Sequence, residues 1–281
     1  MEEPTWTCNI VTKDHSSSGL QRKTKQSCGL ALINEGANLD LQDKWGKTAL
    51  LRAAQHREYG CIMCTQCTLN WRLGNNNQLG LALISGGAKL DLQDEDKHTA
   101  LIHAAENNNT ELGLALINKG AELDLQDKYQ YTALLWAAGR DNTELGLALI
   151  NKGAKLDLQD KYNQTALICA AMNNNTGLGL TLINKGAKWD LQDDHQWTAL
   201  LWAACNNNTE LGLALINKGA ELDLQDKYNQ TALIRAAENN NTELGLALIN
   251  KGANRNLQDK DGKTALDHAE TQEMRDILNS P

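Results

Sequence analysis

The sequence predicts an all-α repeat solenoid, in which helix-turn-helix units stack on one another and are joined by β-hairpin-like turns. The first observation behind this prediction is a fixed period. The tripeptide Thr-Ala-Leu begins at residues 48, 99, 132, 165, 198, 231 and 264, with successive spacings of 51, 33, 33, 33, 33 and 33 residues. The second observation is that each unit holds two apolar segments of roughly nine residues. Helices this short cannot bury their apolar faces alone, so the units are expected to stack.

The first half of residues 226–258 is expected to form a short helix. Thr231 has the side chain of an N-cap, and the following segment Ala232–Ala237 carries small residues on one side. Paired alanines let a neighbouring helix approach closely. The helix is expected to end at the run Asn239–Asn241, because Asn tolerates the left-handed backbone conformation and can cap the next helix.

The second half of the same unit predicts a second helix. Glu243 lies in its first turn, where the helix dipole favours a negative charge, and Leu244, Ala247 and Leu248 follow the spacing of a buried stripe. Lys251 and Gly252 have the residue types that end a helix. The residues after them read as an extended turn into the next unit.

The period assigns most of the chain to repeats. Six full units are predicted over residues 43–258, and residues 259–281 form a shortened C-terminal capping repeat with a polar outer face. Residues 15–42 are predicted to be a degenerate N-terminal capping repeat, preceded by a tail of residues 1–14. The first spacing of 51 residues equals one period plus an insertion of 18 residues, at positions 56–73.

The unit resembles the ankyrin repeat, with a period of 33 residues, a Thr-Ala-Leu-x-x-Ala-Ala first helix and a Gly-Ala ending before the turn. The resemblance covers residues 15–281. It implies stacked helix pairs that bind a partner through the concave face of the first helices and the tips of the turns. The chain departs from the family pattern where Ala replaces its proline, Leu or Ile its histidine, and Asn-Asn its Gly-His loop.

The insertion has a composition unlike that of the repeats, and its cysteines leave three interpretations open. Cys61, Cys64 and Cys67 could share a zinc ion with His56, although structural zinc sites usually use two separated ligand pairs. A long surface loop is tolerated at little thermodynamic cost, and an error of gene reading would give the same pattern. We expect no metal and no cofactor.

The composition excludes several classes of function. The net charge of −8 argues against a nucleic-acid partner, and no apolar run reaches the length of a membrane-spanning helix. The odd count of seven cysteines and the lack of a secretion signal predict an intracellular protein, in the cytoplasm. No phosphate loop, dinucleotide fingerprint or catalytic Cys-His or Ser-His arrangement is present, so the protein is not expected to be an enzyme. The recurring Asp residues, such as Asp124 and Asp127, are interpreted as turn residues.

The copies of the repeat differ from one another at three positions, which are expected to face a partner. These are the turn tip, the residue before Thr, and the fifth residue of Thr-Ala-Leu-x-x-Ala-Ala. Eight of the 12 aromatic residues occupy them, and Tyr and Trp are common anchors of protein interfaces. The predicted partner-binding residues are Trp45, Arg52, Tyr129, Tyr131, Trp136, Tyr162, His195, Trp197, Trp202, Tyr228 and Arg235.

The sequence thus predicts a non-enzymatic, monomeric scaffold that binds a protein through these positions. The alternative is a structural or self-associating spacer, and a metal-binding or redox function through the inserted cysteines is a third. Self-association would need an exposed row formed by the middle leucine of every second helix, whereas neighbouring units are expected to cover these leucines in part. The row consists of Leu30, Leu81, Leu114, Leu147, Leu180, Leu213 and Leu246.

Overall fold

The computed structural model describes residues 33–55 and 76–280, and its regular secondary structure over these residues is α-helical throughout. The chain forms two compact units, Met1–Lys128 and Tyr129–Pro281. The predicted tail, the first-helix part of the N-terminal cap, Leu30 and the insertion with Cys61, Cys64 and Cys67 lie outside the described residues. None of the described helices is both long and apolar enough to cross a membrane.

The first unit contains two described helix pairs. Helices α2 (Ala49–Ala54) and α3 (Asn76–Ser85) pack against each other, as do α4 (Ala100–Glu106) and α5 (Thr110–Asn118). The pairs stack because α2 also contacts α4 and α3 contacts α5.

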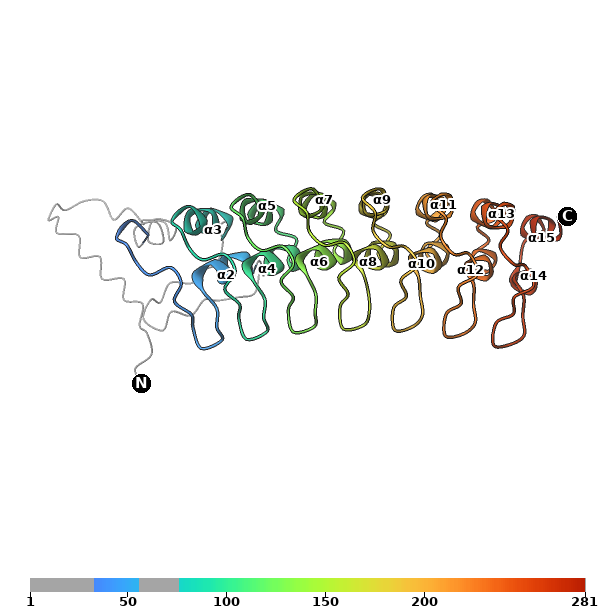
Figure 1. Cartoon of the computed structure of the whole chain (residues 1–281), viewed down its shortest axis with the longest axis horizontal. Coiled ribbons are helices and arrows are strands. Elements are labelled where there is room, and N and C mark those ends of the chain that lie inside the picture. The colour runs from blue at the N-terminus through green and yellow to red at the C-terminus, as the bar shows by residue number, and fades with distance from the viewer. Residues whose placement is uncertain (1–32, 56–75, 281) are drawn as a thin grey trace, which may run out of the picture. The chain divides into compact units, whose positions relative to one another are not determined.

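The second unit repeats this arrangement in two rows, which Figure 1 shows one above the other. The first-helix row consists of α6 (Ala133–Gly139), α8 (Ala166–Met172), α10 (Ala199–Cys205), α12 (Ala232–Glu238) and α14 (Ala265–His268). The second-helix row consists of α7 (Thr143–Asn151), α9 (Thr176–Asn184), α11 (Thr209–Asn217), α13 (Thr242–Asn250) and α15 (Gln272–Asn279). In Figure 1 the connecting turns of this unit extend from the first-helix row on the side away from the second-helix row.

The helix ends follow the expected capping residues. The Thr231 hydroxyl accepts the backbone N–H of Ile234, and Asn241 caps α13 through the N–H of Leu244. Asn240 has a φ of 52° and Gly252 a φ of 93°, so both take the left-handed conformation that ends a helix. The expected helix starts and stops in residues 226–258 are therefore confirmed.

The core is built from Leu, Ile and Ala of both rows. Leu244 and Leu248 are fully buried, but Ala247 is only partly covered, so the expected stripe was wrong in that one position. The residue that is buried instead is Gly245, and the equivalent glycines of α5, α7, α9 and α11 are buried as well. A Cβ on Gly212 would lie 2.7 Å from Cδ1 of Leu244. These mid-helix glycines let adjacent second helices pack closely.

The turns have hairpin-like hydrogen bonds without strand structure in the described ranges. Within one turn, the N–H of Asp226 donates to the carbonyl of Gln230 at 3.0 Å. The Oδ1 atom of Asp226 accepts the N–H groups of Tyr228 and Gln230 at 2.8 and 2.9 Å. Adjacent turns are joined too, since the N–H of Lys260 donates to the carbonyl of Tyr228. The recurring Asp therefore shapes the turn.

The middle leucines of the described second helices are partly covered, as expected. Most are in the intermediate range of exposure, and the most exposed is Leu246 at 43%.

Candidate functional site

The turn tips present exposed aromatic rings on a fixed backbone. Tyr228 is 64% exposed, Trp45 49%, Tyr162 47% and Tyr129 39%, and His195 is exposed as well. The carbonyl of Tyr129 accepts the N–H of Lys161, and the ammonium of this lysine lies 3.9 Å from the centre of the Tyr129 ring. The tips thus expose large apolar groups whose backbones are held by the neighbouring turn.

The other two variable positions of a repeat form a single feature. Tyr131 and Trp136 are five residues apart, and their ring centres lie 4.7 Å apart. Trp197 and Trp202 form the same kind of pair at 4.3 Å. All four side chains are in the intermediate range of exposure. From the sequence, the two positions were interpreted as independent. In the structure their rings lie against each other as a pair.

The predicted basic residues are ion-paired within the chain. Arg52 lies 2.5 Å from Oδ2 of Asp43 and Arg235 lies 2.8 Å from Oδ2 of Asp226. Arg52 also lies over the ring of Trp45, at 5.1 Å from its centre. Both arginines are therefore partly neutralised by a turn carboxylate, and neither is an isolated surface charge.

A cluster of polar side chains lies in the first unit around Asp94. Its Oδ2 atom lies 3.0 Å from Nε2 of His103 and 3.5 Å from the Lys47 ammonium, and the rings of His98 and His103 stack at 4.7 Å. Burial opposes ionisation of Asp94, but the hydrogen bonds from His103 and from the His98 N–H outweigh it and lower the pKa of the carboxyl.

The same cluster has side chains of the types that bind metal ions. Asp94, His98 and His103 offer ligand atoms within 4.8 Å of one another. However, Asp94 Oδ1 already accepts two backbone N–H groups, and its Oδ2 faces the Lys47 ammonium. The positive charge that this carboxylate needs is thus supplied by the chain itself, and the cluster is better described as an ion-pair network.

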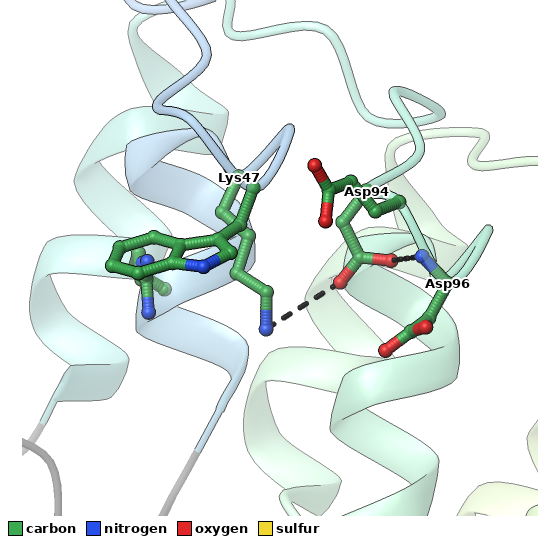
Figure 2. Close-up of a pocket in the computed structure, with 6 residues that line it drawn as sticks. Lys47, Asp94 and Asp96 are labelled. Atoms are coloured by element: carbon green, nitrogen blue, oxygen red, sulfur yellow. Dashed lines mark hydrogen bonds and ion pairs between the residues drawn. The ribbon is translucent and has the colours of Figure 1, made fainter.

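A pocket of about 230 Å³ opens beside this network, between Trp45, Lys47, Arg52, Asp94, Glu95 and Asp96. Figure 2 shows Lys47 reaching toward Asp94, whose carboxylate also accepts the backbone N–H of Asp96. Two of its lining residues, Trp45 and Arg52, are among the predicted partner-binding residues. Both signs of charge meet in this pocket.

Known proteins share the repeat architecture of this chain. Family models for ankyrin repeats match residues 71–160, 137–226 and 215–269. The chain belongs to the ankyrin repeat family. Among solved structures, the crystal structure of the human ASB11 ankyrin repeat domain matches with a TM-score of 0.61 and 22% identity, over 71% of this chain and 90% of that chain. This likeness concerns the fold alone. No curated protein matches the sequence.

Ankyrin repeats are generally protein–protein interaction modules.

The positions at which the repeats of this chain differ are not equally exposed. The fifth residue of Thr-Ala-Leu-x-x-Ala-Ala was expected to face a partner in every repeat. His103 and Cys169 at this position are buried, at 2% exposure each, so that expectation was wrong for them. Burial, with Asp160 and Asp193 nearby, raises the pKa of the Cys169 thiol far above its usual value.

The sequence reasoning missed the carboxylate beneath each pair of variable positions. Asp43, Asp94, Asp226 and Asp259 each contact the basic residue nine positions later, at 2.5 to 3.0 Å. The signal was available, because an invariant acidic residue stood at a fixed spacing from a position that varied between repeats. From the sequence, this aspartate was interpreted only as a turn residue. That accounts for Oδ1, which accepts the turn N–H groups, but not for Oδ2, which contacts the basic side chain.

Proposed function

We propose that this ankyrin array is a non-enzymatic scaffold that binds a protein partner through the turn tips and the paired positions of the first-helix row. The observation that carries the proposal is the exposure of Tyr129, Tyr162 and Tyr228, at 39%, 47% and 64%. A soluble domain gains little from exposing a row of tyrosines, whereas interfaces use them as anchors.

The half-buried aromatic pairs extend this surface within the second unit. Tyr131–Trp136 and Trp197–Trp202 each offer a large apolar area held in place by ring–ring contact. Fixed aromatic rings lose little conformational freedom on binding. Trp45 and Arg52 offer an aromatic and a basic group in the first unit, and His195 and Arg235 add polar groups in the second.

A comparison of captured proteins tests this function. The intact chain, a triple variant with Tyr129, Tyr162 and Tyr228 changed to Ala, and the control Leu246→Ala would each be immobilised in lysate of the source cells. Leu246 is a matched control because it is an exposed apolar residue of the second-helix row. Proteins that the control retains and the triple variant loses, measured by quantitative mass spectrometry, would support the proposal. Equal retention by both variants would refute it.

The alternative of a self-associating spacer is favoured only by the second-helix leucines. Their partial cover leaves Leu246 as the most exposed, at 43%. An isolated exposed leucine is common on monomeric proteins. We therefore propose a monomer, and sedimentation of the intact chain at several concentrations checks this.

A further inference from the structure

The turn aspartates of the chain have a regular arrangement of partners on their second oxygen. In the first unit, Oδ2 of Asp43 contacts Arg52, and Oδ2 of Asp94 contacts His103. In the second unit, Asp226 contacts Arg235 and Asp259 contacts His268. Each of these partners is the side chain nine residues after the aspartate. In these four repeats the chain itself supplies the basic group that the carboxylate needs.

Asp193 departs from this arrangement. The residue nine positions later is Trp202, and the Oδ2 atom of Asp193 is buried with no hydrogen-bond partner in the described structure. The indole Nε1 of Trp202 is also buried without a partner. The side chain of Gln164, the equivalent of Tyr131 in the next repeat, makes two weak contacts with sulfur, at 3.9 Å to Met172 and 4.0 Å to Cys169.

The neighbouring turn aspartate, Asp160, also lacks a basic residue nine positions later. Its carboxylate instead has a hydrogen bond with the Tyr131 hydroxyl, which raises the pKa of this tyrosine after the larger effect of burial. The residue nine positions after Asp160 is Cys169, which carries no positive charge at neutral pH. Oδ1 of Asp193 accepts two backbone N–H groups, but a buried carboxylate oxygen without a hydrogen bond is costly in a folded protein. Such a group calls for an explanation.

The next repeat shows which ligand would satisfy Asp193. Arg235 occupies the place equivalent to Trp202, and its guanidinium lies 2.8 Å from Oδ2 of Asp226. The same guanidinium lies over the ring of Trp197, at 4.6 Å from its centre. A carboxylate and an aromatic face therefore already hold an arginine head group in this array. Asp193 and Trp202 contain the same two components, whereas Trp197, which lies against Trp202, already has the Arg235 guanidinium over its ring.

We infer that Asp193, Trp197 and Trp202 form a binding site for an arginine side chain of the partner, with the guanidinium pairing with Asp193 against an indole face. The inference rests on the proposed function and names the chemistry that the partner presents. Because Oδ2 of Asp193 is covered, the Trp202 indole moves aside when the guanidinium enters. Arginine suits the site because its planar guanidinium both pairs with carboxylates and stacks on aromatic rings.

The test uses the intact chain and a small probe. N-acetyl-argininamide is titrated into the protein while the indole N–H signal of Trp202 is followed by NMR, with N-acetyl-citrullinamide as an uncharged probe of the same shape. The arginine probe is expected to shift the signal with a dissociation constant on the order of 1 mM. The citrulline probe is expected to bind about tenfold more weakly.

Two variants separate binding from folding. Asp193→Asn keeps an oxygen that accepts the N–H groups of His195 and Trp197, so the turn is retained while the charge is lost. Trp202→Arg supplies the guanidinium from the chain itself, as Arg235 does for Asp226. Both are expected to lose the preference for arginine over citrulline, which for Trp202→Arg is followed on the Trp197 indole.

Several outcomes would overturn the inference. They are an arginine response that persists in Asp193→Asn, equal responses to both probes, or no response to either. Failure here with partner capture intact would remove the arginine site and leave the proposed function standing. A normal response to arginine without tyrosine-dependent capture would leave the arginine site standing and remove the proposed function.

Discussion

Nε2 of His103 lies 3.0 Å from Oδ2 of Asp94, and the two side chains are almost fully buried. Burial alone would lower the pKa of His103, but hydrogen bonds to Asp94 and Glu106 outweigh it and raise the pKa above its usual value. Since the folded-state pKa is higher than the unfolded one, the protonated histidine stabilises the fold fully below pH ~6.5. This contribution is lost as the pH rises through the folded-state pKa.

The first prediction concerns this pair. His103→Arg is expected to keep the ion pair at all pH values up to 9, because Arg does not titrate there and the chain already uses Arg at the equivalent positions 52 and 235. His103→Gln is expected to cost about 2 kcal/mol of unfolding free energy at pH 6. Urea unfolding at pH 6 and pH 9 measures both.

The lowered pKa of Asp94 sets the lower end of the pH range in which the ion pair with His103 stabilises the fold. Its stabilising effect is present above pH ~4 and is lost as the pH falls through the folded-state pKa. If the difference in unfolding free energy between the parent and His103→Arg stays constant from pH 6 to pH 9, the raised pKa of His103 would be contradicted.

The second prediction compares two glycines of α9. A Cβ on Gly179 would lie 2.9 Å from Cδ1 of the fully buried Leu211, whereas a Cβ on Gly177 would have its nearest atom at 3.6 Å. Gly179→Ala is expected to destabilise the protein by about 1–3 kcal/mol through overpacking. Gly177→Ala is the matched control and is expected to gain up to ~1 kcal/mol from helix propensity. Equal effects in denaturant unfolding would show that the close packing of α9 and α11 is unimportant.

The sequence predicted the periodic features of this molecule better than the particular ones. Capping by Thr231 and Asn241 could be predicted because these interactions are local. The burial of Gly245 could not, since it depends on the approach of Met274 from α15. The pairing of Trp197 with Trp202 depends on how the turn meets the helix, which the spacing of five residues does not determine.

The third prediction concerns two cysteines of the second unit. Cys169 is 2% exposed, and burial raises the pKa of its thiol, as do nearby carboxylates. Cys205 is less buried than Cys169, and its partial burial also raises the pKa of its thiol. Because the thiolate is the reactive form, a brief iodoacetamide treatment of the native protein is expected to label Cys205 well before Cys169. Peptide mapping by mass spectrometry gives both rates, and faster labelling of Cys169 would contradict its buried position.

The fourth prediction concerns the insertion. Helices α2 and α3, on either side of it in the sequence, pack against each other as α4 and α5 do. Deletion of residues 56–73 restores the spacing of 33 residues, so the melting temperature is expected to change by only a few degrees, roughly. Loss of the helical circular dichroism signal would show that the segment is structural. Zinc bound to the intact chain, measured by elemental analysis, would favour the metal-binding interpretation.

The last prediction locates the energetic centre of the proposed interface in the second unit. Trp136 is half-buried, lies against the tilted ring of Tyr131 and has the Arg140 guanidinium 5.3 Å from its ring centre. A large aromatic group fixed in this way at an interface typically contributes about 2 kcal/mol or more to binding. Trp136→Ala is therefore expected to weaken partner affinity roughly thirtyfold.

The control for this variant is again Leu246→Ala, which removes a more exposed apolar side chain from the second-helix row. Affinities of the parent and both variants for a captured partner can be compared by calorimetry, with circular dichroism to confirm that each is folded. Arg52→Ala is expected to act differently, since it leaves Asp43 without its ion-pair partner at 2.5 Å. Its effect should combine lost stability with a changed salt dependence of binding. A Trp136 variant that binds as tightly as Leu246→Ala would place the interface elsewhere on the repeats.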